Sequence, residues 1–318
     1  MTTFHRRLQA LLLAATAGLV AIGAPTRAEA QGARAPSLLI TSQELQRLLG
    51  ANDLVLLQVG TKEDYDTGHI PGARLVDFTA LAAPRVEGEP MLELPAPDAL
   101  KSAVEALGIS DNSKIVVISG EDWGSPATRV IFTLQLAGLG DRTQLLDGGS
   151  RRWKAAGFAM STGTPAPPRA GHLTRAQDRS LVVDFAWLSR SLPPRGFTLV
   201  DARAPIFYEG AGMNDGRGMK HDAGHVPGAH NLPFNTLFDD NVHLFSREEL
   251  RQKFTAAGIN PGDSIVVYCH IGQQATMVFF AARLLGHPVR LYDGSFTDWE
   301  AHNGPIENAT KPAAARPE

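Results

Sequence analysis

Cysteine is the scarcest residue of this sequence, because Cys269 is the only one among 318 residues. A single thiol cannot build an internal disulfide framework or a cysteine-based metal site, and we expect neither a metal nor a cofactor. Excess positive charge is also absent, since 30 Lys and Arg residues stand against 33 Asp and Glu residues, for a net charge of −3. This balance gives no basic stripe, so nucleic acid is not an expected partner. The length indicates two domains.

A long apolar run is missing too. The longest one, Ala10–Ala24, is shorter than the roughly 20 residues that a membrane span needs. It follows a positive start at residues 5–7 and precedes Ala28–Ala30, which places small residues where a signal peptidase cleaves. We therefore expect residues 1–30 to be a cleaved signal peptide, with no membrane span afterwards and a periplasmic or secreted mature protein. The cleavage site has no cysteine, so no lipoprotein anchor is expected.

The sequence contains two copies of one unit. Three pairs of segments match in the same order: GHIPGA at 68–73 with GHVPGA at 224–229, Ile115–Ile118 with Ile265–Tyr268, and Asp147-Gly148 with Trp153 against Asp293-Gly294 with Trp299. Such repetition indicates a duplicated unit of about 130 residues. A Pro-rich stretch, Thr164–Pro168, lies between the copies and has linker composition.

Within each copy, short apolar runs alternate with helical patterns. The expected strands are Leu54–Val59, Ile115–Ser119 and Gln144–Leu146 in the first copy, and Phe197–Asp201, Ile265–Tyr268 and Val289–Tyr292 in the second. Capping boxes at Thr41…Glu44 and Ser246…Glu249 predict helix starts, and a further helix is expected after Gln273 with a stop at Gly286. The predicted fold class is α/β, in which each copy has a central, mainly parallel sheet with helices on both faces.

Features that both copies share are expected to be structural. This reasoning assigns structural roles to His69 and His225 of the repeated motif, to the Asp-Gly pairs at 147 and 293, and to Trp153 and Trp299 as core aromatics. Features found in one copy only are candidates for chemistry.

Cys269 is the main such feature. It ends an expected strand, and the loop from Cys269 to Gln274 leads directly into a helix at Ala275. Loop amides that converge at a helix N-terminus form an anion-binding concavity, which stabilises a thiolate and lowers the pKa of the thiol. The arrangement predicts a nucleophilic cysteine. The first copy has Ser119 or Glu121 in this place, depending on the alignment, so it is expected to be catalytically silent.

Two other differences supply candidate substrate-binding residues. Asp201-Ala-Arg203 ends a strand where the first copy has Gln58–Gly60. Arg203 is expected to anchor an anionic substrate or the rim of the cysteine loop, or else to be a surface salt-bridge partner of Asp201. The second copy also carries about 13 extra residues at 210–223, where Lys220 provides positive charge among glycines. This insert is either part of the substrate site or a solvated loop.

These residues resemble the tandem-domain rhodaneses, the thiosulfate and 3-mercaptopyruvate sulfurtransferases, over roughly residues 38–308. The resemblance implies that Cys269 takes sulfur from a small anionic donor, becomes a persulfide, and passes the sulfur to cyanide or a thiol by a ping-pong mechanism. It implies that Arg203 contacts the donor and that the persulfide is held by the backbone N–H groups of His270, Ile271, Gly272, Gln273, Gln274 and Ala275. The expected organisation is then a non-catalytic domain at 31–160, a linker at 161–180, a catalytic domain at 181–308 and a tail at 309–318.

Alternatives stay open for the sulfur donor and for the class of reaction. The loop has His270 and Ile271 where the thiosulfate enzymes carry basic side chains, and it lacks the Gly-Ser-Gly-Val run of the mercaptopyruvate enzymes. Phe207 stands where the vertebrate enzymes have a second arginine. Thiosulfate is the expected donor, with 3-mercaptopyruvate as the alternative. A non-catalytic sulfur carrier is the alternative of another class, and a cysteine-dependent phosphatase or arsenate reductase is disfavoured because no arginine closes the loop.

Overall fold

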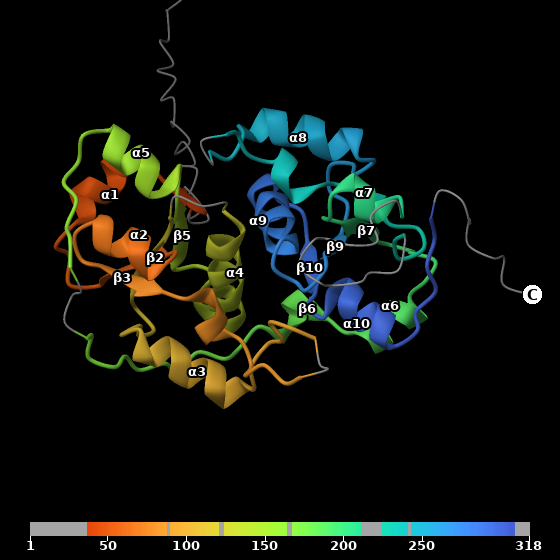
Figure 1. Cartoon of the computed structure of the whole chain (residues 1–318), viewed down its shortest axis with the longest axis horizontal. Coiled ribbons are helices and arrows are strands. Elements are labelled where there is room, and N and C mark those ends of the chain that lie inside the picture. The colour runs from red at the N-terminus through yellow and green to blue at the C-terminus, as the bar shows by residue number, and fades with distance from the viewer. Residues whose placement is uncertain are drawn as a thin grey trace, which may run out of the picture. The chain divides into compact units, whose positions relative to one another are not determined.

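Each half of the chain builds a five-stranded sheet in which every pairing is parallel. The strand order is β1-β5-β4-β2-β3 in the first half and β6-β10-β9-β7-β8 in the second, so the two orders are equivalent (Figure 1). The strands are β1 Leu39–Ile40, β2 Leu54–Val59, β3 Ala73–Val76, β4 Lys114–Ser119, β5 Thr143–Leu146, β6 Val182–Val183, β7 Thr198–Asp201, β8 His230–Asn231, β9 Ile265–Tyr268 and β10 Val289–Tyr292. The predicted α/β class with two similar parallel-sheet units is confirmed.

The structure is a computed structural model that describes residues 37–87, 90–120, 124–163, 167–210, 224–240 and 243–308. The predicted signal peptide, the tail at 309–318, Glu121 and Lys220 lie outside the described residues. All the described residues belong to one unit, Pro36–Glu318. None of the helices in these ranges is both long and apolar enough to cross a membrane.

Helices cover both faces of each sheet. They are α1 Ser42–Leu48, α2 Lys62–Thr67, α3 Pro97–Ala106, α4 Ser125–Leu134 and α5 Gly149–Ala155 in the first half, and α6 Phe185–Arg190, α7 Pro205–Tyr208, α8 Arg247–Ala256, α9 Ala275–Leu285 and α10 Ser295–Ala301 in the second. The predicted capping boxes form at Thr41 and Ser246, where each side chain accepts from the backbone of the glutamate three residues on. Helix α9 ends as expected at Gly286, which is left-handed.

The core shows why the strands read as continuous apolar runs. Along β9, Ile265 and Val267 belong to the cluster with α8 and α9, whereas Val266 and Tyr268 belong to the cluster with α6 and α10. Successive strand residues point to opposite faces of a sheet, so a strand covered on both faces is apolar at every position.

The histidines of the repeated motif are structural, as predicted. His69 stacks on Tyr65 with ring centroids 3.9 Å apart, and its Nδ1 bonds to the Tyr65 carbonyl oxygen. His225 repeats both contacts with Tyr208, at 3.8 Å. The partners are four residues apart in the first half and 17 apart in the second, a difference of 13 that places the predicted insert between Tyr208 and His225.

Helices α4 and α9 pack side by side and join the two halves (Figure 1). Residues in equivalent positions meet there: Thr128 Oγ1 lies 2.9 Å from Thr276 Oγ1, and the Gln273 amide donates to Ser125 Oγ at 3.2 Å, both pairs being 148 residues apart. Phe132 of α4 packs into the core of the second half, and its equivalent, Phe280 of α9, packs into the core of the first. Each half therefore completes the core of the other.

Candidate functional site

Cys269 stands between β9 and the loop that begins α9, as the sequence predicted. Its backbone N–H donates to Ser295 Oγ at 3.1 Å, and its carbonyl oxygen accepts from the Phe296 N–H at 3.0 Å. The start of α10 thus fixes the main chain of the cysteine. Cys269 itself has no exposed surface.

Backbone amides converge on the Cys269 sulfur. The N–H groups of Ile271, Gly272, Gln274 and Ala275 donate hydrogen bonds to it. These are four of the six amides predicted to hold a persulfide, and they come from the loop and the first turn of α9. A sulfur atom that gains negative charge at this position meets several oriented donors and the positive end of a helix dipole.

The expected low pKa of the thiol is wrong for this structure. Burial raises the pKa of Cys269 above its ordinary value, and the four backbone hydrogen bonds lower it by less. The reason is that complete removal from water penalises the thiolate more strongly than the loop amides compensate. The sequence pattern indicated the amides correctly but carried no information on the depth of the sulfur.

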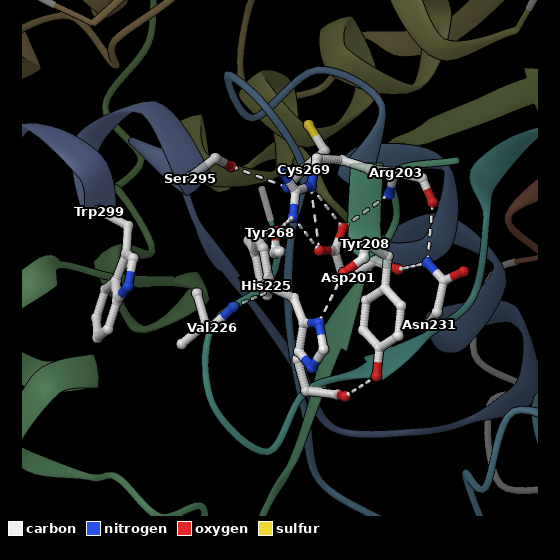
Figure 2. A network of polar contacts seen from close by, with 12 residues as sticks. Asp201, Arg203, Tyr208, His225, Val226, Asn231, Tyr268, Cys269, Ser295 and Trp299 are labelled. Atoms are coloured by element: carbon white, nitrogen blue, oxygen red, sulfur yellow. Dashed lines mark hydrogen bonds and ion pairs between the residues drawn. The ribbon is translucent and has the colours of Figure 1, made fainter. Parts of the chain in front are cut away.

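Arg203 and Asp201 form a buried ion pair rather than a surface one. Neither side chain has exposed surface, and Arg203 Nη2 lies 2.6 Å from Asp201 Oδ2 (Figure 2). The same nitrogen donates to the Gly224 carbonyl oxygen at 2.7 Å, and the guanidinium lies over the Phe296 ring at 3.8 Å from its centroid. Burial opposes the charge of Arg203, but Asp201 outweighs it and the pKa of Arg203 is raised. These contacts support β7 beneath the cysteine loop, and the Cys269 sulfur points away from them (Figure 2).

An aromatic side chain flanks the residue after the cysteine. Phe207 of α7 meets the His270 ring edge-on, with centroids 4.7 Å apart. The His270 carbonyl oxygen accepts from the Thr297 backbone N–H at 3.0 Å and from Thr297 Oγ1 at 2.9 Å. Ile206, next to Phe207, is 52% exposed. On the α7 side, His270 of the loop is therefore flanked by an aromatic ring.

The first half contributes a side chain that sequence reasoning missed. Arg129 of α4 is almost fully buried, and its Nη1 donates to the Gly272 carbonyl oxygen at 3.1 Å and to Asp293 Oδ1 at 2.6 Å. A signal for it exists in the sequence, because Arg129 is the only charged residue of an otherwise uncharged helix. Asp293 accepts this ion pair, whereas its equivalent, Asp147, pairs with Arg152 of its own half.

The equivalent place in the first half has no thiol. Ser119 ends β4 there, and its side chain is buried. No cluster of three or more His, Cys, Asp or Glu side chains suited to a metal ion occurs within the described ranges.

Two sequence comparisons bear on this arrangement. The Rhodanese-like domain family matches the chain twice, over residues 41–156 and 184–302. A Pseudomonas aeruginosa protein named "Probable 3-mercaptopyruvate sulfurtransferase" is 35% identical over 275 residues, which cover 82% of this chain and 94% of that protein. The thiosulfate sulfurtransferase of Bos taurus is 33% identical over 255 residues, covering 78% of this chain and 83% of that one.

Solved structures share the fold. The crystal structure of YnjE superposes with a TM-score of 0.75 at 23% identity, covering 88% of this chain and 69% of that one. The wild-type structure of EanB gives a TM-score of 0.73 at 24% identity, covering 85% of this chain and 69% of that one. At this level of identity the likeness concerns the fold alone.

Proposed function

The chain belongs to the tandem-domain rhodanese family of sulfurtransferases, and on that premise we propose that it moves a sulfane sulfur from thiosulfate to cyanide or another thiophile through a persulfide on Cys269. The observation that carries the proposal is the convergence of four backbone N–H groups on the only cysteine of the chain.

The proposed reaction has two steps. The Cys269 thiol first gives its proton to water that enters with the donor. Its thiolate then attacks the outer sulfur of thiosulfate, the S–S bond of the donor breaks, and sulfite leaves with the bonding electron pair. Cyanide then attacks the outer sulfur of the persulfide, the Cys–S–S bond breaks, and thiocyanate leaves while the thiolate is restored. The enzyme is sulfurated before the acceptor reacts, so a ping-pong mechanism follows.

The loop amides supply the stabilisation that these steps need. The resting thiol is neutral because burial disfavours its ionised form, and negative charge resides on sulfur only in the reacting thiolate and the persulfide. Hydrogen bonds aimed at a developing charge stabilise it without reorganisation, since the donors are already in place. Because Cys269 has no exposed surface, donor entry requires a local opening next to the loop.

A second donor, 3-mercaptopyruvate, is favoured by a specific finding. The relative at 35% identity carries that activity in its name, and the side chains beside the loop, Phe207 and His270, are not the basic ones that thiosulfate binding favours. Comparison of kcat/KM for the two donors, with cyanide as the common acceptor, decides between them.

The decisive experiment is steady-state thiocyanate formation. The Cys269→Ser variant is expected to lose it entirely, whereas Ser119→Ala, which alters the equivalent position of the first half, is expected to keep the wild-type rate. Double-reciprocal plots should be parallel, and intersecting plots would contradict a covalent persulfide.

The same samples test the other classes. A stable +32 Da adduct on Cys269 with no turnover would indicate a sulfur carrier. Hydrolysis of p-nitrophenyl phosphate that disappears in Cys269→Ser would indicate a phosphatase.

We also propose that the chain is exported and acts in the periplasm or outside the cell, with Gln31 as the first residue of the mature protein. The support is the sequence pattern of residues 1–30. N-terminal sequencing of the protein from a periplasmic fraction tests this, and an uncleaved Met1 would refute it.

A further inference from the structure

Arg129 connects the two halves at the cysteine loop. Besides Gly272 and Asp293 of the second half, its guanidinium binds another segment of its own half, where Nη2 donates to the Leu92 carbonyl oxygen at 2.5 Å. Asp293 is held from the same segment, because Asp293 Oδ2 accepts from the Leu94 N–H at 3.0 Å. Leu92 has a left-handed backbone with φ of 62°, which a leucine adopts only when its surroundings impose it. The guanidinium thus lies at the centre of a bridge between the halves.

The bond to the Gly272 carbonyl acts on the orientation of the loop. In a trans peptide the C=O and the N–H of the same plane point in opposite directions. Arg129 draws the carbonyl of the Gly272–Gln273 peptide toward α4, so the N–H of that peptide faces away from α4. The neighbouring N–H groups, those of Gly272 and Gln274, both donate to the Cys269 sulfur. A rotation of this peptide plane would therefore displace donors on both sides of it.

The fit around Gly272 leaves the loop little room to move. Gly272 has φ of +77°, and a Cβ at this position would lie 2.5 Å from the Asp293 carbonyl oxygen and 3.0 Å from Arg129 Nη1. The loop backbone is thus packed directly against the two ends of the ion pair.

From these contacts we propose that Arg129, although it belongs to the half without the cysteine, is a positioning residue for sulfur transfer, which holds the Gly272–Gln273 peptide so that the loop amides stay aimed at Cys269. The inference rests on the proposed function only where it predicts that Arg129 affects sulfur-transfer turnover. Its effect on the thiol is measurable without any sulfur donor.

The test compares Arg129→Lys with a matched control, Thr128→Val. Lysine keeps the charge beside Asp293, but one ammonium lacks the forked geometry that reaches Gly272, Asp293 and Leu92 together. Thr128→Val removes the contact with Thr276 at the same interface and leaves the loop contacts intact. Urea unfolding of both variants measures the structural cost.

Two readouts address positioning. Iodoacetamide labels the only cysteine, and the pH at half-maximal labelling rate reports the ionisation of Cys269. In Arg129→Lys we expect this pH to rise by about one unit and kcat for thiocyanate formation to fall about tenfold, as for the loss of one hydrogen bond to a charged group. Thr128→Val should match the wild type in both readouts.

The outcomes separate the two proposals. A folded Arg129→Lys with the labelling profile of the wild type overturns the positioning role, whether or not the wild type forms thiocyanate. A wild type that forms no thiocyanate refutes the proposed function and leaves the labelling test valid. If Arg129→Lys does not fold, Asp293→Asn removes the charge that orients the guanidinium, and an unchanged labelling profile in that variant likewise overturns the role.

Discussion

Gly272 offers the sharpest test of how the cysteine loop is built, through the substitution Gly272→Ala. Its left-handed φ of +77° costs a non-glycine residue about 1–2 kcal/mol. Alanine has fewer conformations than glycine in the unfolded chain, and this lower entropy offsets roughly 0.4–1 kcal/mol of the cost. The added Cβ would also lie 2.5 Å from the Asp293 carbonyl oxygen, so the backbone must shift, and overpacking of this kind costs about 1–3 kcal/mol. We expect Gly272→Ala to lower the free energy of unfolding by roughly 2–4 kcal/mol.

The same shift should impair turnover. Moving the loop away from Asp293 displaces the Gly272 N–H from the Cys269 sulfur, and a hydrogen bond to a charged group contributes about 1.5–3 kcal/mol. The predicted fall in kcat is therefore roughly 10-fold to 100-fold.

Gly262 is the matched control for this experiment. Its φ of +88° imposes the same backbone penalty, but a Cβ there would meet nothing within 4 Å. Gly262→Ala should cost only about 1 kcal/mol and leave kcat unchanged. Urea unfolding followed by tryptophan fluorescence reports both halves, because Trp153 and Trp299 are each buried in one of them. Equal costs for the two variants, or wild-type turnover in Gly272→Ala, would refute the argument from close packing.

Three further predictions follow from the site. Burial holds the pKa of Cys269 above its value in the unfolded chain, so the resulting stabilisation is complete below pH about 8.5 and is lost as the pH rises through the folded pKa. Urea unfolding should therefore show that the free energy of unfolding falls above pH about 8.5, and that it falls less in Cys269→Ala. Identical pH profiles of the free energy of unfolding in the two proteins would contradict the prediction. Arg203→Met leaves Asp201 buried without its partner and should destabilise the protein by about 3–5 kcal/mol. A raised KM at unchanged stability would instead support the sequence-based prediction that Arg203 contacts the sulfur donor. Phe207→Arg places positive charge beside His270 and should lower KM for thiosulfate, which initial rates over a range of donor concentrations measure.

The sheets were predictable because their central strands are buried on both faces. Leu54–Val59, Ile265–Tyr268 and Val289–Tyr292 coincide with the observed strands, since parallel strands of this kind read as uninterrupted apolar runs. The edge strands β1, β3, β6 and β8 were not predicted. β1, β6 and β8 are only two residues long, too short to show any periodicity. β3, Ala73–Val76, places Arg74 among apolar residues and shows neither an uninterrupted apolar run nor strict alternation.

The candidate site was predictable only in its local part. The strand, loop and helix around Cys269 follow from neighbouring residues, so the amides of Ile271 and Ala275 could be placed near the sulfur from the sequence. The contact between Arg129 and Asp293 joins residues 164 positions apart, and no local pattern indicates which buried charges meet across two domains. The depth of Cys269 likewise depends on the packing of many side chains at once.

The exchange of Phe132 and Phe280 between the cores means that neither half has a complete core without the other. A chimaera that joins residues 181–308 to a rhodanese-like half from another protein would need an aromatic side chain at the position of Phe132, because that ring packs into the core beside α9. Substitutions in the contact between α4 and α9 are therefore expected to be tolerated only when the residue that packs against the changed one, on the other helix, is changed with it.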